Sequence, residues 1–506
     1  MRRLGIVAAV LSCAVVLGGC VPWLGQSSPM TSTPTGEKVA ADLQPFYDQV
    51  LDWSACEDGF QCATAKAPLD WGDPDRDSIE LALIRTVATG DRLGSLLINP
   101  GGPGASGYEF VRDSIDYAVS AKLQSSFDIV GFDPRGVNKS SAVDCYDDPA
   151  EMTAFLYDLS PEPVRSEAWI DDLEQSSAEF GQACLEHTGE LLGFVDTVSA
   201  AHDLDLLRSI LGDEKLNYLG YSYGTLLGAT FADLYPEKTG RLVLDGAVDP
   251  ATTDFEVTAT QAQGFESALR AYLADCMTGS ECPFRGSVDR AMTDIRALFE
   301  SLDASPLRAA DGRQLGSGAM FNALILPLYS SSTWPYLTDL FVDVMKGKAD
   351  YAFRLADSYY GRNEDGTFAD NSTEAFTAVN CLDYVSTSSR ETLHAEAAEL
   401  ARLAPVLGPQ MSYRGTSCDD WPFEATRLRV PIAASGSAPI VVVGTTNDPA
   451  TPYKWAQALA DQLENGYLVT YDGEGHTAYN KSNACVNDAV DGYFIDGRVP
   501  ETDPLC

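Results

Sequence analysis

The chain has 506 residues, 45% of them apolar, which is enough for one large hydrophobic core with an insertion or for two cores. Acidic residues outnumber basic residues by 74 to 34, which gives a net charge of −40 at pH 7. Such a charge repels nucleic acid, so DNA and RNA are not expected as partners, and it favours cationic ligands.

The N-terminal residues 1–19 are predicted to be a signal peptide of the lipoprotein type. A short basic start precedes an apolar, small-residue run that is too short for a membrane span. The run ends in Leu-Gly-Gly-Cys, which resembles a bacterial lipobox and implies lipid attachment to Cys20 after cleavage. An ordinary secretory signal is the alternative, and both place the protein outside the cytoplasm, lipid-anchored or secreted. Residues 20–40, rich in Ser, Thr, Pro and Gly, are expected to be a flexible tether.

The cysteine count agrees with export. Two of the 12 cysteines, Cys13 and Cys20, lie in the leader, which leaves ten, and an even number in an exported chain suggests disulfides. No histidine accompanies the closely spaced cysteines at ligand spacing, so no metal site is expected. The connectivity is open from sequence alone. Pairing of neighbours along the chain would give Cys56–Cys62, Cys145–Cys184, Cys276–Cys282, Cys381–Cys418 and Cys485–Cys506.

Residues 41–250 are predicted to form the first part of an α/β core. Residues 40–55 are expected to be a helix that ends at Trp53. Apolar strand-like runs then alternate with helical periodicity, which predicts a mostly parallel sheet covered on both faces. The predicted strands are 62–69, 79–87, 94–98, 127–132 and 241–244, and the clearest helical segments are 165–186 and 197–211.

A serine motif follows one of these strands. The strand-like run Lys215–Leu219 leads into Gly-Tyr-Ser-Tyr-Gly, and a helical stretch follows. In this strand–turn–helix setting the serine sits in a strained turn with its hydroxyl exposed, so Ser222 is predicted to be a nucleophile. The backbone amide of Tyr223 can face a developing oxyanion. For the second amide we expect Gly102, with Gly101 close behind, from the glycine-rich loop after the strand 94–98.

The pattern changes between residues 251 and 408. Its apolar periodicity is mostly helical, and we expect an inserted helical cap there. Residues 409–506 are predicted to be the C-terminal part of the core, because strand-like runs return at 439–443 and 467–471.

A serine nucleophile needs a general base, and two histidines follow it in the chain. His394 lies within a predicted helix and is expected to be exposed. His476 lies in a glycine-rich loop directly after a strand, where a sheet presents catalytic groups, so it is predicted to be the base.

The orienting acid is expected to be Asp448, in the loop after the strand 439–443, and Asp245 is its rival. Thr451 is most simply the N-cap of the following helix, with Pro452 in the first turn. The alternative for Thr451 is a supporting hydrogen bond to the Asp448 carboxylate.

Several motifs resemble the proline iminopeptidase-like α/β-hydrolases. They are Asn-Pro-Gly-Gly-Pro-Gly at 99–104, Asp-Pro-Arg-Gly at 133–136, Gly-Tyr-Ser-Tyr-Gly-Thr at 220–225, Asn-Asp-Pro-Ala-Thr-Pro at 447–452 and Gly-Glu-Gly-His at 473–476. Their order over residues 45–506 is most similar to the actinobacterial tripeptidyl aminopeptidase group, which is exported. Asn99 replaces a histidine of the iminopeptidase loop, and Asn138 replaces a glycine.

The resemblance implies an α/β-hydrolase fold with a helical cap and a serine peptidase that releases short peptides from free N-termini without a cofactor. An aminopeptidase must bind the substrate ammonium, for which a pair of cap carboxylates would serve. Asp383 is one candidate, because Cys381 can pin its loop. An esterase or lipase with the same triad is the first alternative, and a non-catalytic envelope-binding protein is the second.

Overall fold

A nine-stranded sheet runs through the larger half of the molecule in the computed structural model, which describes residues 30–506 except 58, 386–388, 426–428 and 501–502. The strand order is β1-β2-β3-β5-β4-β6-β7-β10-β11, antiparallel as far as β5 and parallel beyond it. The strands are β1 Ser54–Cys56, β2 Phe60–Pro68, β3 Ser78–Thr86, β4 Gly94–Asn99, β5 Phe127–Phe132, β6 Leu216–Tyr221, β7 Thr239–Asp245, β10 Ile440–Asn447 and β11 Gly466–Glu474. The predicted signal peptide and Cys20 lie outside the described residues.

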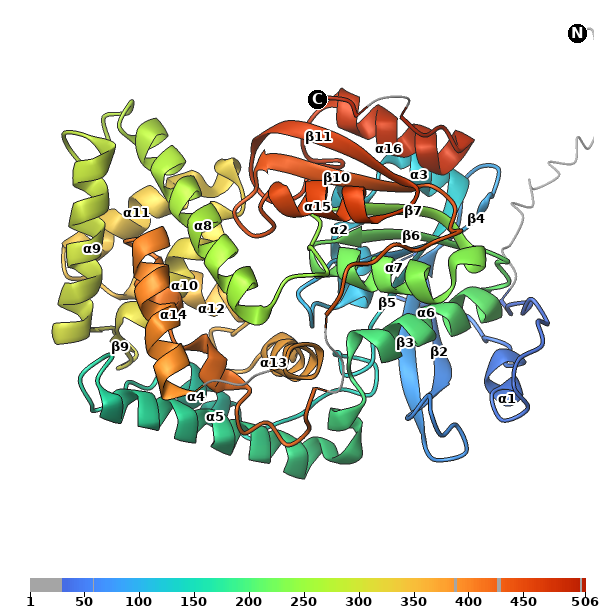
Figure 1. Ribbon diagram of the computed structural model, residues 1–506, viewed down its shortest axis with the longest axis horizontal. Helices are drawn as coiled ribbons and strands as arrows, with labels where there is room; N and C mark the ends of the chain where they lie inside the picture. The colour runs from blue at the N-terminus through green and yellow to red at the C-terminus, as the bar shows by residue number, and fades with distance from the viewer. Residues whose placement is uncertain (1–29, 58, 386–388, 426–428, 501–502) are drawn as a thin grey trace, which may run out of the picture.

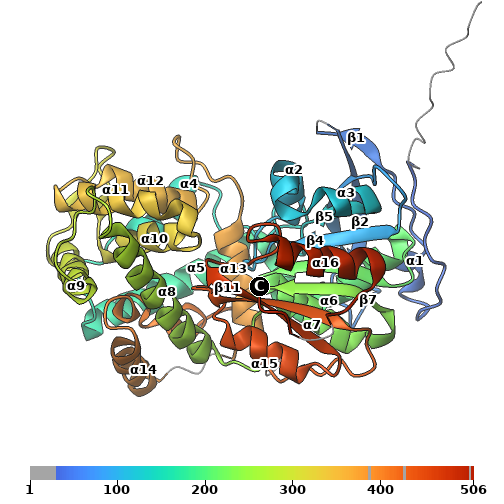
Figure 2. The same cartoon turned by 90° about the horizontal axis from the view of Figure 1, so that it is seen from above.

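Helices cover both faces of this sheet (Figure 2). Every residue of β4 and β5 is buried, as expected for central strands packed on two sides. One hydrophobic cluster joins the sheet to α2, α3 and α16, and another joins it to α6, α7 and α15. The predicted α/β-hydrolase fold is confirmed. The bounds are α2 Gly107–Ala118, α3 Ala121–Ser126, α6 Thr197–Leu211, α7 Tyr223–Leu234, α15 Lys454–Gln462 and α16 Ala484–Asp496.

A helical cap lies beside the sheet and has its own hydrophobic core (Figure 1). The segment predicted as the cap, 251–408, holds seven helices and a small hairpin among its described residues. They are α8 Asp254–Cys276, α9 Val288–Ala304, β8 Leu307–Arg308, β9 Gln314–Leu315, α10 Ser317–Leu328, α11 Trp334–Met345, α12 Asp350–Tyr359, α13 Ser372–Asp383 and α14 Arg390–Leu403.

The cap also takes material from outside that segment. Helices α4 (Pro149–Tyr157) and α5 (Glu167–Thr188) run beneath it in Figure 1, and Tyr157 is buried in the cap core. Met411 belongs to the same core, and the sheet resumes only at Ile440. The predicted boundaries at 251 and 408 therefore enclose the inserted helices, but the hydrophobic core of the cap also includes residues outside them.

The N-terminal region differs from its prediction in two ways. The helix expected over residues 40–55 is a single turn, α1 (Gln44–Tyr47), because the chain must straighten to pair β1 with β2. Part of the tether expected over 20–40 is bound to the core, since Thr31 pairs with Asp52 and the Thr35 N–H donates to the Ser209 carbonyl at 3.0 Å. Residues 20–29 of that prediction lie outside the described residues.

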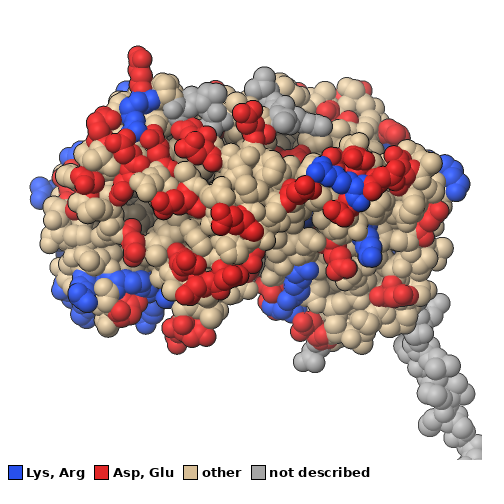
Figure 3. Space-filling view, turned by 90° about the horizontal axis from the view of Figure 1, so that it is seen from below, with Lys and Arg blue, Asp and Glu red and all other residues tan. Residues whose placement is uncertain are grey.

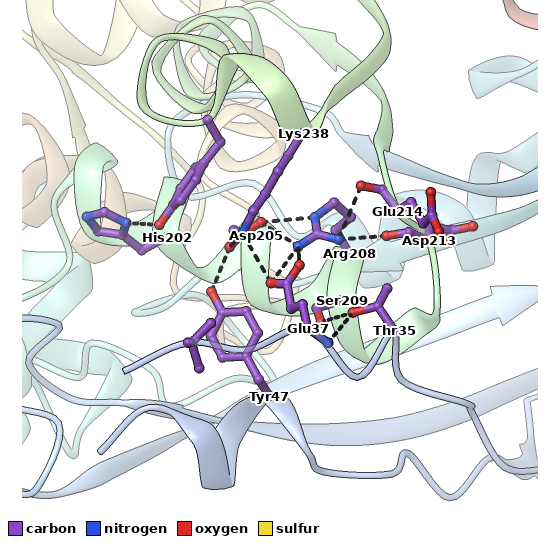
Figure 4. Close-up of polar contacts among 12 residues, drawn as sticks. Thr35, Glu37, Tyr47, His202, Asp205, Arg208, Ser209, Asp213, Glu214 and Lys238 are labelled. Carbon is purple, nitrogen blue, oxygen red and sulfur yellow. Dashed lines mark hydrogen bonds and ion pairs between the residues drawn. The ribbon is translucent and has the colours of Figure 1, made fainter. Parts of the chain in front are cut away.

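Charged side chains fasten this N-terminal segment to α6, and we call Glu37, Tyr47, Asp205, Arg208 and Lys238 the clasp (Figure 4). The Arg208 guanidinium donates to both Glu37 oxygens at 2.8 and 2.9 Å, and Lys238 bridges Glu37 and Asp205 at 3.1 and 2.7 Å. The Tyr47 hydroxyl donates to Asp205 at 2.7 Å. Residues 35–47 are thus bound to the core by a network, which is worth more than a single surface ion pair.

The C-terminus is also bound to the core. The Cys506 N–H donates to the Thr470 carbonyl at 2.7 Å, and the Thr470 N–H donates to the Pro504 carbonyl at 2.9 Å. Residues 504–506 therefore cover the outer edge of β11. The disulfide Cys485–Cys506 closes this arrangement, and all five disulfides in the structure are the neighbour pairs.

The surface is strongly acidic. Carboxylates are scattered over the face shown in Figure 3, with fewer lysines and arginines between them. None of the helices in the described part of the chain is both long enough and apolar enough to span a bilayer.

Candidate active site

Ser222 occupies a sharp turn between β6 and α7. Its φ of 54° and ψ of −124° are strained for a residue with a side chain. The strand and the helix pass so close that a Cβ on Gly220 would lie 2.3 Å from the Gly224 carbonyl oxygen. The Ser222 N–H donates to the Asp245 carbonyl at 2.9 Å, which fixes the turn to β7. The sequence therefore folds here as the Gly-x-Ser-x-Gly pattern predicts.

Asp448 and His476 meet beyond the ends of β10 and β11. The imidazole Nδ1 lies 2.9 Å from each carboxylate oxygen of Asp448. Asp448 is 3% exposed, and its oxygens also accept hydrogen bonds from the N–H groups of Ala450, Thr451 and Thr477 at 2.8–3.2 Å. These backbone donors hold the carboxylate in one orientation, so it can fix the imidazole in turn.

Thr451 supports this pair. Its hydroxyl donates to Asp448 Oδ2 at 3.0 Å and lies 3.2 Å from His476 Nδ1. Helix α15 begins at Lys454 with Tyr453 as its N-cap, so the N-cap role predicted for Thr451 is wrong. The alternative, a hydrogen bond to the carboxylate, is the one that the structure contains.

Gly246 lies between the His476 imidazole and the Ser222 turn. A Cβ on Gly246 would lie 3.2 Å from His476 Cε1, and Gly246 directly follows the residue that binds the Ser222 N–H. Among the described residues, no hydrogen bond joins the Ser222 hydroxyl to His476. Catalytic hydrogen bonds often form fully only when substrate is present, so a hydrogen bond between the Ser222 hydroxyl and His476 is part of the proposed mechanism.

The cap also holds the histidine loop, which the sequence did not reveal. The His476 N–H donates to the Tyr329 carbonyl at 2.8 Å, and the Tyr329 ring packs edge-on against the imidazole at 5.4 Å. Tyr329 is the C-cap of α10, far from His476 in the chain. Only the folded cap brings them together.

The two rival residues have other contacts. The Asp245 carboxylate accepts from the Ala478 N–H at 3.0 Å and the Tyr479 N–H at 2.8 Å, so it holds the loop after His476 and not the imidazole. His394 is exposed on α14 and lies 2.8 Å from a Glu167 oxygen.

Two residues that line the same cavity as Ser222 have a backbone N–H without a hydrogen-bond acceptor among the described residues. One is Tyr223 at the start of α7, and the other is Gly102. The Gly101 N–H is already used, since it donates to Asn99 Oδ1 at 2.9 Å. The loop still lies against the turn, because a Cβ on Gly101 would be 2.8 Å from the Ser222 Cβ. The structure thus favours Gly102 over Gly101 as the second donor.

A cavity of about 570 Å³ opens between the cap and Ser222. Gly102, Tyr223 and Thr451 line it together with residues of α8, α13 and α14. A second cavity, of about 610 Å³, lies on the other side of Asp383 and Arg429, which line both.

Asp383 is in the cavity wall, as its prediction requires, but its carboxylate is already bound. It accepts from the Thr197 N–H at 2.9 Å and from the Thr197 hydroxyl at 2.5 Å. Burial raises the pKa of Asp383 to about 6, although these hydrogen bonds act in the opposite direction.

Two further carboxylates in the same wall escaped the sequence analysis. Asp254 begins α8, and Glu396 lies on α14. Burial raises the pKa of Glu396, and the charge of Asp254 raises it further, so the two groups are close enough to interact. Burial also raises the pKa of Asp254, against the lowering effect of Arg414 and Arg429. No local pattern marks these residues, because two separate helices contribute them.

Comparison with known proteins supports the same family. A family model described as alpha/beta hydrolase fold matches residues 94–305, and one described as TAP-like protein matches residues 404–506. The chain is 35% identical over 531 residues to the serine protease Hip1 of Mycobacterium tuberculosis, covering 100% of this chain and 98% of the relative.

Two other relatives carry different names. Carboxylesterase B of Mycobacterium tuberculosis is 36% identical over 523 residues, which cover 100% of this chain and 99% of the relative. The tripeptidyl aminopeptidase of Streptomyces lividans is 30% identical over 471 residues, which cover 90% of this chain and 86% of the relative. The resemblance drawn from the motifs is confirmed: the chain belongs to the tripeptidyl aminopeptidase group of the α/β-hydrolases, and it is a serine hydrolase.

Proposed function

We propose that this protein removes short peptides, three residues long, from the free N-termini of peptides or proteins by serine-dependent acyl transfer. The hydrogen-bonded Asp448–His476 pair beside the strained Ser222 turn is the observation that carries the proposal. The relatives named serine protease and tripeptidyl aminopeptidase support it.

In this reaction His476 takes the proton of the Ser222 hydroxyl as the oxygen attacks the scissile carbonyl. The imidazole then gives the proton to the leaving amine, and water releases the peptide from the acyl-enzyme. Asp448 holds the imidazole tautomer and stabilises its charged form. The N–H groups of Gly102 and Tyr223 bind the oxyanion, and losing one such donor raises the activation free energy by about 3 kcal/mol.

The substrate ammonium is proposed to bind Asp254 and Glu396. Both line the cavity that holds Ser222, and a cation between two carboxylates relieves their mutual repulsion. Asp383 was the candidate from sequence, but Thr197 occupies its carboxylate. A peptide of three extended residues spans about 10 Å, so a tripeptide product requires about this distance between the ammonium site and Ser222.

The site of action is proposed to be outside the cytoplasm. Five disulfides tie the described chain, and such bonds persist in oxidising compartments. Anchoring through a lipid on Cys20 is the proposed link to the membrane, with secretion as the alternative.

An esterase is the second candidate, because a carboxylesterase is among the relatives and the same triad cleaves esters and amides. The aminopeptidase and the esterase differ in whether the substrate must carry a free N-terminal ammonium. An aminopeptidase depends on the free ammonium, whereas an esterase for neutral substrates gains nothing from Asp254 and Glu396.

The test is digestion of a peptide library in which each sequence occurs with a free and with an acetylated N-terminus. We expect wild type to release tripeptides from the free peptides only and Ser222→Ala to release nothing. Internal cleavage of the acetylated peptides would contradict the exopeptidase assignment. Faster turnover of short p-nitrophenyl esters than of any free peptide would favour the esterase, and a lack of Ser222 labelling by a fluorophosphonate would reject both.

A further inference from the structure

Helix α13 stands between the cap and the core in both views of the molecule (Figures 1 and 2). It belongs to the inserted segment, yet its buried residues Ala378, Val379, Cys381 and Leu382 pack in the hydrophobic cluster of α6 and α7, not in the cap core. It therefore contacts the part of the core that carries the two candidate oxyanion donors.

The first turn of α13 lies against the glycine loop that provides Gly102. A Cβ on Gly104 would be 2.7 Å from the Ser372 carbonyl oxygen and 2.9 Å from the Phe376 nitrogen. The residue before the helix is also held, because the Asn371 side chain donates to the carbonyls of Gly136 and Val143 at 2.9 and 2.7 Å. The N-terminal end of α13 thus has little room to shift relative to the loop.

The last residue of α13 reaches the other donor through a chain of hydrogen bonds. The Thr197 hydroxyl donates to Asp383 at 2.5 Å and lies 2.6 Å from the Tyr223 hydroxyl. Since the Thr197 proton is used on Asp383, the Tyr223 hydroxyl donates to Thr197. Tyr223 is the residue whose backbone N–H is proposed to bind the oxyanion, and it is 8% exposed.

The disulfide Cys381–Cys418 fixes this end of the helix to the chain that follows α14. Both ends of α13 are therefore anchored, one beside Gly104 in the loop of Gly102 and the other through Thr197 to the Tyr223 hydroxyl. A rigid helix that contacts two groups at both ends fixes the distance between them, which preorganised oxyanion binding requires.

We infer that α13 is the element that sets the geometry of the oxyanion hole, and that Thr197 and Asp383 are positioning residues acting through Tyr223. The inference rests on the serine mechanism proposed above. It goes beyond that mechanism in giving a cap helix a part in binding the transition state, not only in covering the substrate.

The test compares Tyr223→Phe and Thr197→Val with wild type in the full-length protein, on a tripeptidyl p-nitroanilide. Both variants lack one hydroxyl of the chain and keep the Tyr223 backbone N–H. Misplacing a catalytic group can cost about 100-fold, so we expect kcat to fall about 10- to 100-fold while KM changes about threefold or less. A peptide boronate, whose anion occupies the oxyanion position, should bind more weakly by the same factor as kcat/KM falls.

Two controls separate positioning from general damage. Thr197→Ser restores the hydroxyl and should restore kcat. Tyr272→Phe removes a tyrosine hydroxyl bonded to Thr338 at 3.1 Å in the cap core and should leave kcat unchanged. Retention of wild-type kcat by Tyr223→Phe and Thr197→Val would overturn the inference, as would equal losses in Tyr272→Phe. If wild type and Ser222→Ala were alike in turnover and fluorophosphonate labelling, the serine mechanism itself would fail instead.

Discussion

At the scale of single residues, the candidate site combines the groups proposed for catalysis with groups that hold them in place. Asp448 accepts hydrogen bonds from three backbone N–H groups and from the Thr451 hydroxyl, and only then faces His476. A buried carboxylate with so many donors is fixed in direction and compensated for its loss of water. Because the His476 imidazole is hydrogen-bonded to this carboxylate, its orientation is fixed as well.

The carboxylates at the cavity wall give a prediction on substrate choice. We expect Asp254→Asn and Glu396→Gln each to raise KM for peptides with a free N-terminus about tenfold, the loss of one charge-assisted contact, and to leave KM for an uncharged ester unchanged. Steady-state kinetics on both substrates measures this. Glu399→Gln, on the same helix but paired with Arg402 outside the cavity, is the matched control.

Acidification of wild type should have the same effect as these substitutions. Burial raises the pKa of both carboxyls, so they become neutral at a higher pH than ordinary carboxyls do, and KM for free N-termini should rise as the pH falls. A KM that depends on pH equally for free and uncharged substrates would contradict the ammonium site.

The residues that sequence could and could not predict differ in a physical way. Ser222, Asp448 and His476 each follow a strand, and a local pattern marks each of them, so all three could be predicted to lie at one edge of the sheet. The structure joins two of them, Asp448 and His476, by hydrogen bonds. Asp254 and Glu396 carry no local signal, because their proximity depends on how two cap helices pack. Thr451 was ambiguous, since one hydroxyl can cap a helix or support a carboxylate, and only the fold decides.

At the scale of elements, the parallel strands β4, β5, β6, β7, β10 and β11 were predicted to within a few residues because buried parallel strands are continuous apolar runs. The short antiparallel strand β1 was missed, since it lies where a helix was predicted. The packing of the cap was not predictable in the same way. Helices α4 and α5 precede the nucleophile in sequence, yet Tyr157 of α4 packs in the cap core and Ile170 of α5 packs against Leu393 of α14. Helix α13 lies in the cap segment but packs with the core. Amphipathic periodicity shows that a helix has an apolar face, not which partner covers it.

The disulfides provide a prediction at this scale. Removing Cys381–Cys418, whose cysteines are 37 residues apart, should lower the free energy of unfolding by about 4 kcal/mol, against about 2 kcal/mol for Cys276–Cys282, which are six residues apart. Urea unfolding of the two double-alanine variants measures this. Only the first variant should also lose kcat, because only that bond holds the end of α13. Equal losses of kcat in both variants would argue against a special role of this helix.

At the scale of the whole molecule, two described segments near the ends of the chain, residues 35–47 and 504–506, are bound to the core. The clasp gives a prediction for the N-terminal one. Glu37→Ala leaves Arg208, whose side chain is 1% exposed, with fewer acceptors, and should lower the free energy of unfolding by about 2 kcal/mol, less than for a fully buried pair because Glu37 is 24% exposed. The exposed pair Arg402–Glu399 is the control, and Glu399→Ala should leave the free energy of unfolding nearly unchanged. Equal shifts of the urea midpoint would mean that the clasp adds nothing beyond a surface contact.

The pairing of residues 504–506 with β11 affects how readily copies of this protein associate with one another. An unpaired outer strand would expose its backbone N–H and carbonyl groups to another molecule. Here the Thr470 N–H and carbonyl are already hydrogen-bonded to Pro504 and Cys506. Trimming the last few residues should therefore favour self-association before it affects folding.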